Sequence, residues 1–299
     1  MKDTPATRLL TAAAPILFVL MWATGFVVAR LSAPHADPLT FLSIRFPIAG
    51  LLFALIALAV AAPWPGPTKA FHAAMAGVLL HGAYLGPVYW AVAHGMPAGV
   101  SALIVGLQPL MTAILAAWMV KEEISLRHWL GLLVGILGVA LVVSPKLHTG
   151  LTGGITPLTT AVNVLGALSI SLGTVYQKRY ATDLNLASGG AWQYVGATLL
   201  VLVAALFTED LRFDGTFAAW FSLGWSVIVL SLGAISLLML LIRLGEVSRV
   251  SSLIFLVPGV SALMAYGLFG ETLTLVQILG MAVCAAAVLI VTRRWSRPA

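Results

Sequence analysis

Residues 100–122 read VSALIVGLQPLMTAILAAWMVKE, and residues 250–271 read VSSLIFLVPGVSALMAYGLFGE. Each stretch is an apolar run close to the roughly 20 residues that cross a bilayer, with a proline inside it and a glutamate at its end. With one residue deleted, the two stretches share Val100 with Val250, Ser101 with Ser251, Leu103 with Leu253, Pro109 with Pro258, and Glu122 with Glu271. Matched serines, prolines and glutamates arise by chance less readily than matched leucines, so the pair indicates an internal repeat.

The repeat extends outward from these stretches at a shift of about 150 residues. Residues 25–33 resemble residues 173–181, and residues 49–52 resemble residues 197–200. We therefore expect two halves, residues 1–147 and 148–299, with five spans each. An odd number of spans makes the second half enter the membrane from the opposite side, so the halves are expected to be inverted repeats.

The composition points to a bilayer as the main solvent. Charged residues make up 9% of the 299 positions and hydrophobic residues 61%, against roughly 25% charged residues in soluble domains. The apolar runs lack the strict alternation of a membrane β-barrel. The sequence therefore predicts an all-α integral membrane protein with ten transmembrane helices, which begin near Ala12, Leu39, Ala73, Gly99, His128, Thr156, Ser188, Ala218, Val250 and Leu275.

The positive charges predict the orientation of this bundle. Twelve of the 16 Lys and Arg residues fall on the side of the two termini, three fall on the other side, and Arg45 lies inside the second span. Cationic loops stay in the cytoplasm, so we expect a multi-pass protein of the cell inner membrane with both termini cytoplasmic. The cations are scattered, which argues against a nucleic-acid partner. Cys284 is the single cysteine, so no thiolate metal cluster is expected.

Four short motifs carry a resemblance to a known family. They are residues 22–26 (WATGF), 45–46 (RF), 121–125 (KEEIS) and 270–274 (GETLT). Together with the five-plus-five spans, they resemble the EamA-type branch of the drug/metabolite transporter superfamily. The resemblance implies transport of metabolites, and the chain looks most like bacterial exporters of amino acids, including aromatic ones.

One departure from that superfamily concerns energy coupling. Its small multidrug-resistance members exchange protons on a glutamate within the first helix. Here all ten Asp and Glu residues fall in expected loops or at span ends. Proton antiport on a buried carboxylate is therefore disfavoured, and passive facilitation or coupling through another group is favoured.

The third expected span carries polar and aromatic candidates for substrate binding. His81 is the only histidine well inside an expected span, where an ionisable group is a functional hypothesis by default. The alternative is a neutral ring hydrogen-bonded to a neighbouring helix. Tyr84 follows one helical turn later and Tyr89 extends the stripe, either as packing or as an aromatic, hydrogen-bonding surface for a substrate. Trp22 lies deep enough in the first span to reach a cavity.

Other candidates lie on different spans. Arg45 either snorkels to the headgroups or faces the bundle, where its guanidinium suits a substrate carboxylate. Gln108 and Asn163 are expected to line a cavity. Pro109 and Pro258 should kink the fourth and ninth spans, either as a static shape or as a hinge.

These residues predict a transporter with a central, mostly apolar cavity that works by alternating access. Its expected substrates are amino acids, aromatic or otherwise neutral, and related small metabolites. A broad metabolite or drug exporter is the alternative, favoured if Arg45 faces lipid and the cavity offers no group for a carboxylate. The chain has no motif typical of an intramembrane enzyme and no receptor-like domain, so we expect no catalytic residues, no metal and no cofactor. We expect a monomer in the bilayer.

Overall fold

A computed structural model describes residues 5–96, 101, 104–147, 155–244, 247–269 and 273–292. Within these ranges the regular elements are helices, apart from one isolated β-bridge between Ala36 and Phe213. The first half contains α1 (Pro5–Ser32), α2 (Pro38–Ala59), α3 (Pro67–Gly77), η1 (Val78–Gly82), α4 (Ala83–Ala93), α6 (Gln108–Met119) and α7 (Leu126–Leu147). The second half contains α8 (Pro157–Tyr180), α9 (Leu186–Thr208), α10 (Phe217–Trp225), η2 (Ser226–Ala234), α11 (Ile235–Leu244), α12 (Val247–Ser252), η3 (Leu253–Leu256), α13 (Val257–Phe269) and α14 (Leu275–Thr292).

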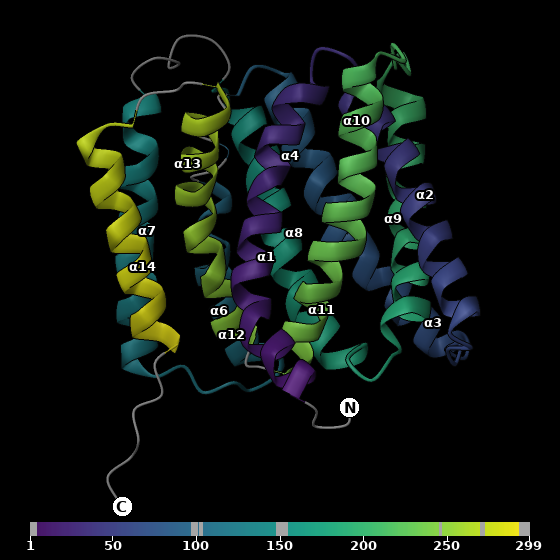
Figure 1. Ribbon diagram of the computed structural model, residues 1–299, viewed down its shortest axis with the longest axis horizontal. Helices are drawn as coiled ribbons and strands as arrows, with labels where there is room; N and C mark the ends of the chain where they lie inside the picture. The colour runs from purple at the N-terminus through teal and green to yellow at the C-terminus, as the bar shows by residue number, and fades with distance from the viewer. Residues whose placement is uncertain are drawn as a thin grey trace, which may run out of the picture.

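The helices occupy the places at which the sequence predicts spans. In the described part of the chain, five helical stretches are long and apolar enough to cross a membrane: Pro38–Ala59, Pro67–Ala93, Pro157–Tyr180, Leu186–Thr208 and Phe217–Leu244. Shorter apolar helices are Ala13–Gly25, Gln108–Met119, Leu126–Val142, Val250–Met264 and Leu275–Val291. Helix α1 begins and α14 ends on the same side of the bundle (Figure 1). The chain is a multi-pass helical membrane protein.

Local sequence signals explain where several of these helices begin. Proline is the first residue of α2, α3 and α8, where its missing N–H breaks no helical hydrogen bond. Thr156 caps α8 through a reciprocal pair of hydrogen bonds with Thr159. The side chain of Asn185 accepts hydrogen bonds from the first turn of α9.

Two helix pairs lie at opposite ends of the bundle (Figure 1). Helix α7 packs along α14 at one end, and α2 packs along α9 at the other. Glycines bring the backbones of α7 and α14 together: a Cβ atom on Gly280 would lie 2.7 Å from the backbone nitrogen of Val142. Helices α1, α6, α8 and α13 lie between these pairs and form the middle of the bundle.

In the part of the chain that the structure describes, four of the spans are interrupted. The third span contains the π-helical segment η1, and the eighth span contains the π-helical segment η2. Their first residues, Val78 and Ser226, lie 148 positions apart. Such segments occur often at functional sites. The fourth span turns at residues 106–107 before α6, and the ninth passes through the 3-10 segment η3 before α13.

The prolines follow the last two interruptions directly. Pro109 is the second residue of α6, and Pro258 is the second residue of α13. The sequence predicts kinks inside continuous helices. The structure instead places each proline in the first turn of a new helix, where proline is well tolerated. Residues 270–272, which belong to the motif at residues 270–274 (GETLT), lie outside the described residues.

At the face opposite the start of α1, a short ribbon joins two loops. The backbone N–H of Asp37 donates to the carbonyl of Arg212 at 3.0 Å, and that of Asp214 donates to the carbonyl of His35 at 3.0 Å. The side chains add an ion pair between Arg212 and Asp37 and a contact of 2.6 Å between His35 and Asp214. The ribbon, residues 35–37 with 212–214, therefore ties the α1–α2 loop to the α9–α10 loop.

Candidate substrate site

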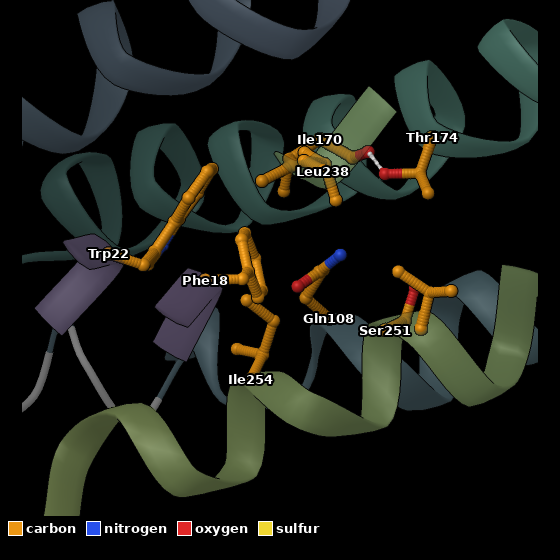
Figure 2. Close-up of a pocket in the computed structure, with 9 residues that line it drawn as sticks. Phe18, Trp22, Gln108, Ile170, Thr174, Leu238, Ser251 and Ile254 are labelled. Atoms are coloured by element: carbon orange, nitrogen blue, oxygen red, sulfur yellow. Dashed lines mark hydrogen bonds between the residues drawn. The ribbon is translucent and has the colours of Figure 1, made fainter. Parts of the chain in front are cut away.

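A pocket lies among helices from both halves of the chain (Figure 2). It is tight in this conformation: the space between its atoms, open solvent at its mouth included, is about 240 Å³. None of its lining residues is charged. They are Phe18, Trp22, Gln108, Ile170, Thr174, Leu238, Val250, Ser251 and Ile254.

Aromatic rings from α1 form one wall of the pocket. The ring centroids of Phe18 and Trp22 lie 5.1 Å apart, with their planes tilted by 49°. The two residues are four positions apart, so one face of the helix presents both rings. Aromatic surfaces of this kind offer large contact area to an apolar or aromatic ligand.

Two buried polar side chains in this pocket each carry an oxygen atom without a hydrogen-bond partner. Gln108 is 3% exposed and Ser251 2% exposed, yet Gln108 Oε1 and Ser251 Oγ bond to no other group. Figure 2 shows the Gln108 carboxamide pointing into the space between α8 and the α12–η3 segment. The third polar residue, Thr174, is satisfied, because its hydroxyl donates to the carbonyl of Ile170 at 2.7 Å. Buried unpaired polar atoms are rare and costly, so Gln108 and Ser251 mark a place for a ligand.

A hydrogen bond to its backbone carbonyl holds Gln108 in place at the start of α6. Gln108 is the first residue of α6, directly after the turn in the fourth span. Its carbonyl accepts a hydrogen bond of 3.2 Å from the Ser171 hydroxyl on α8, which also lies 2.8 Å from the carbonyl of Ala167. The start of α6 is therefore held against α8.

Arg45 faces the bundle and not the lipid. The side chain is 4% exposed, and its Nε donates to Ser231 Oγ in η2 at 3.0 Å. The guanidinium also lies over the Phe46 ring, 5.8 Å from its centroid. Among the described residues no carboxylate lies within 4.0 Å of this cation, and Arg45 does not line the pocket.

His81 belongs to a satisfied hydrogen-bond network. Its Nε2 donates to Gln193 Oε1 at 3.3 Å, and Gln193 Nε2 donates to Gln177 Oε1 at 2.7 Å. The His81 ring stacks on Tyr194 with centroids 4.7 Å apart and planes within 4°. The geometry matches the alternative of a ring hydrogen-bonded to a neighbouring helix. We call Arg45, His81, Gln177, Gln193, Tyr194 and Ser231 the α9 network.

The remaining candidates lie outside the pocket lining. Tyr84 packs in a cluster with Leu80 and Ile170, against which Trp22 also packs. His81 lies within η1 and Tyr84 just after it, and the wider π-helical turn gives them different neighbours, so they do not form the expected stripe. Tyr89 packs with the α2–α9 cluster.

Asn163 is fully buried, and its side chain bonds to Met96, in the turn that follows α4. Its Nδ2 donates to Met96 Sδ at 2.9 Å, and its Oδ1 has no partner. Of the predicted binding residues, the pocket therefore brings together Trp22 and Gln108. Sequence reasoning missed Phe18, although its position one turn before Trp22 on the same face could have revealed it, and it used Ser251 only as a repeat match.

The fold and the pocket define a class: a polytopic helical membrane protein with a small uncharged site between its two halves. The profile of the EamA-like transporter family matches residues 9–144 and again residues 159–293. The chain belongs to the EamA-like transporter family and is a membrane transporter of that family.

Similar proteins agree with this assignment. The inner membrane transporter YedA of Escherichia coli K12 is 25% identical over 91% of this chain and 87% of its own length. The transporter YvbV of Bacillus subtilis is 27% identical over 98% and 94% of the two chains. A probable amino-acid metabolite efflux pump of Salmonella typhimurium is 25% identical over 92% of each. A crystal structure of another protein has the same fold, with a TM-score of 0.77 and 17% identity over 93% of this chain and 95% of that one.

Proposed function

We propose that this transporter exports neutral amino acids, aromatic ones first, together with related small metabolites. The observation that carries the proposal is the pocket itself, which the rings of Phe18 and Trp22 line together with the unpartnered oxygens of Gln108 and Ser251. Such a site offers an apolar side chain stacking area and offers a polar head hydrogen bonds. The name of the Salmonella relative, an amino-acid metabolite efflux pump, supports the same substrate class.

The proposed architecture is two inverted five-helix repeats, residues 1–147 and 148–299, with both termini in the cytoplasm. The double match of the family profile supports it, as does the spacing of η1 and η2. The expected partners by repeat also pack together, because α2 lies along α9 and α7 along α14. Inverted repeats with a site at their interface are the usual basis of alternating access.

In this proposal the interruptions before Pro109 and Pro258 serve as hinges. Both lie beside pocket residues, since Gln108 precedes Pro109 and Ile254 belongs to η3, just before Pro258. The ribbon of residues 35–37 and 212–214 joins the loops on one face, which favours closure of that face in this conformation. Bending at the interruptions would open it and close the other.

A broader metabolite or drug exporter is the second candidate, and one observation favours it. No charged side chain lines the pocket, and the buried Arg45 guanidinium lies in the α9 network instead. The pocket thus holds no cation to bind a carboxylate, although Arg45 does face the bundle.

Flux from proteoliposomes loaded with amino-acid mixtures tests the function. We expect phenylalanine, tryptophan and other neutral amino acids to equilibrate without a pH or sodium gradient, because the described part of the chain carries no carboxylate at membrane depth. Trp22→Ala should reduce flux at least tenfold, whereas Trp220→Ala, at an exposed position on α10, should not. Flux of unrelated drugs with no amino-acid flux would favour the second candidate, and absence of any flux would overturn the proposal.

A further inference from the structure

The pocket combines buried hydrogen-bonding groups with a complete lack of charge. Its polar groups are one carboxamide, two hydroxyls and the indole N–H of Trp22, and its other lining side chains are apolar. A carboxamide offers a donor and an acceptor side by side, and Gln108 uses its Oε1 for no bond within the protein. Its natural complement is a ligand group that also donates and accepts.

The absence of a counter-charge sets a second condition on the ligand. Moving an isolated charge into a low-dielectric site is expensive unless an opposite charge meets it there. A neutral amide avoids this cost, and a zwitterion brings its own counter-charge. A ligand with a net positive or negative charge finds no compensation among Gln108, Ser251 and Thr174.

We propose that this pocket selects ligands of zero net charge whose polar head both donates and accepts hydrogen bonds, with Gln108 and Ser251 as the specificity-determining residues. The head lies against Gln108 and Ser251, and the apolar part lies against Phe18 and Trp22. The inference rests on the proposed function, because it names the substrate class of the same site.

Four derivatives of one aromatic side chain separate charge from shape. Phenylalanine is a zwitterion, N-acetylphenylalaninamide is neutral, N-acetylphenylalanine is an anion, and phenylalaninamide is a cation at pH 6 because α-amino groups titrate near pH 7.7 to 8.0. Binding is measured as the ligand-dependent rise in melting temperature of the purified protein, and transport as flux from liposomes. We expect the first two compounds to bind and the last two to bind at least tenfold more weakly.

A change of pH gives a test within a single ligand. Raising the pH from 6 to 9 neutralises phenylalaninamide, so its binding should increase about tenfold or more. N-acetylphenylalaninamide does not titrate in this range and reports any change in the protein itself. Equal gains for both compounds would contradict selection by ligand charge.

Substitutions assign the selectivity to the two residues. Gln108→Leu and Ser251→Ala should each weaken the binding of neutral ligands by about 2- to 12-fold, the range for one lost hydrogen bond. Gln108→Glu supplies a carboxylate of similar shape, so it should shift the preference toward the phenylalaninamide cation by about tenfold or more. The matched control is Asn163→Asp, which changes another buried amide outside the pocket lining and should leave the preference unchanged.

The outcomes separate this inference from the proposed function. Binding that follows ligand charge without any flux would retain the selectivity and overturn transport of these compounds. Flux with equal binding of all four compounds, or with a preference that Gln108→Glu leaves unchanged, would overturn the selectivity and retain transport.

Discussion

Gln108 and Gln193 are chemically identical, equally buried, and used in opposite ways. Gln193 accepts a hydrogen bond from His81 and donates one to Gln177, so its carboxamide is satisfied by protein on both sides. The carboxamide of Gln108 faces a pocket, and its Oε1 has no partner. At membrane depth the residue type alone does not distinguish a binding group from a packing group. The distinction lies in where the hydrogen bonds end.

Backbones approach one another closely around the α9 network. A Cβ atom on Gly77 would lie 1.8 Å from the carbonyl oxygen of Gln193, and one on Gly196 would lie 2.1 Å from that of Ala74. Gly25, on α1, has its nearest neighbour, Leu230, at 3.7 Å, an ordinary contact. The α9 network therefore lies in a region without spare space.

The largest effect on stability is expected at the close contact between α3 and α9. Gly77→Ala must push α3 away from α9, and overpacking of this kind costs typically 1–3 kcal/mol or more in stability. Gly25→Ala fits without displacement and serves as the matched control. Thermal unfolding of the two purified variants in detergent measures the difference, and equal melting temperatures would show that α3 and α9 separate freely.

The next effect compares the two glutamines directly. Gln193→Leu removes the hydrogen-bond partner that both His81 and Gln177 use, and it leaves their polar groups buried. We therefore expect a loss of about 1–3 kcal/mol in stability. Gln108→Leu removes a carboxamide whose Oε1 makes no bond and should change stability by less than about 0.5 kcal/mol while reducing transport. Melting temperature and flux are measured on both variants. A destabilised Gln108→Leu protein with normal flux would reverse the assignment of the two regions.

The smallest expected effect on stability concerns the proposed hinges. Pro109→Ala and Pro258→Ala should fold normally, because each proline lies in the first turn of its helix and alanine is a good helix former. We expect both to straighten their spans and to change how fast a cysteine placed at Thr174, in a Cys284→Ala background, reacts from each membrane face. Pro67→Ala, at the first position of α3, is the control. Unchanged labelling and transport in both variants would leave the interruptions as fixed shape.

The sequence predicts the spans well, because an apolar run of sufficient length is a local property. It also indicates the interruptions near Pro109 and Pro258 and two residues of the pocket, Trp22 and Gln108. It does not predict η1 or η2, since a π-helical segment depends on the packing around it and carries no distinctive residue pattern here.

Two buried polar residues show what the sequence leaves open. His81 is a binding candidate because ionisable groups at that depth are costly, but its partner Gln193 lies 112 positions away in the chain. Arg45 finds Ser231 across 186 positions. Such long-range hydrogen bonds decide whether a buried polar group is satisfied, and a single sequence does not reveal them.

The buried guanidinium of Arg45 has a consequence for the passage of ions through the bundle. It places a fixed positive charge inside the bundle with no carboxylate within 4.0 Å among the described residues. At an effective dielectric constant of about 20, a second unit charge about 10 Å away feels a repulsion of about 2 kcal/mol. Sodium ions and protons are repelled, while solutes without net charge are not. In the proposed transport cycle, a path that opened within this distance of Arg45 would therefore admit cations poorly, as in pores where a fixed positive charge excludes them.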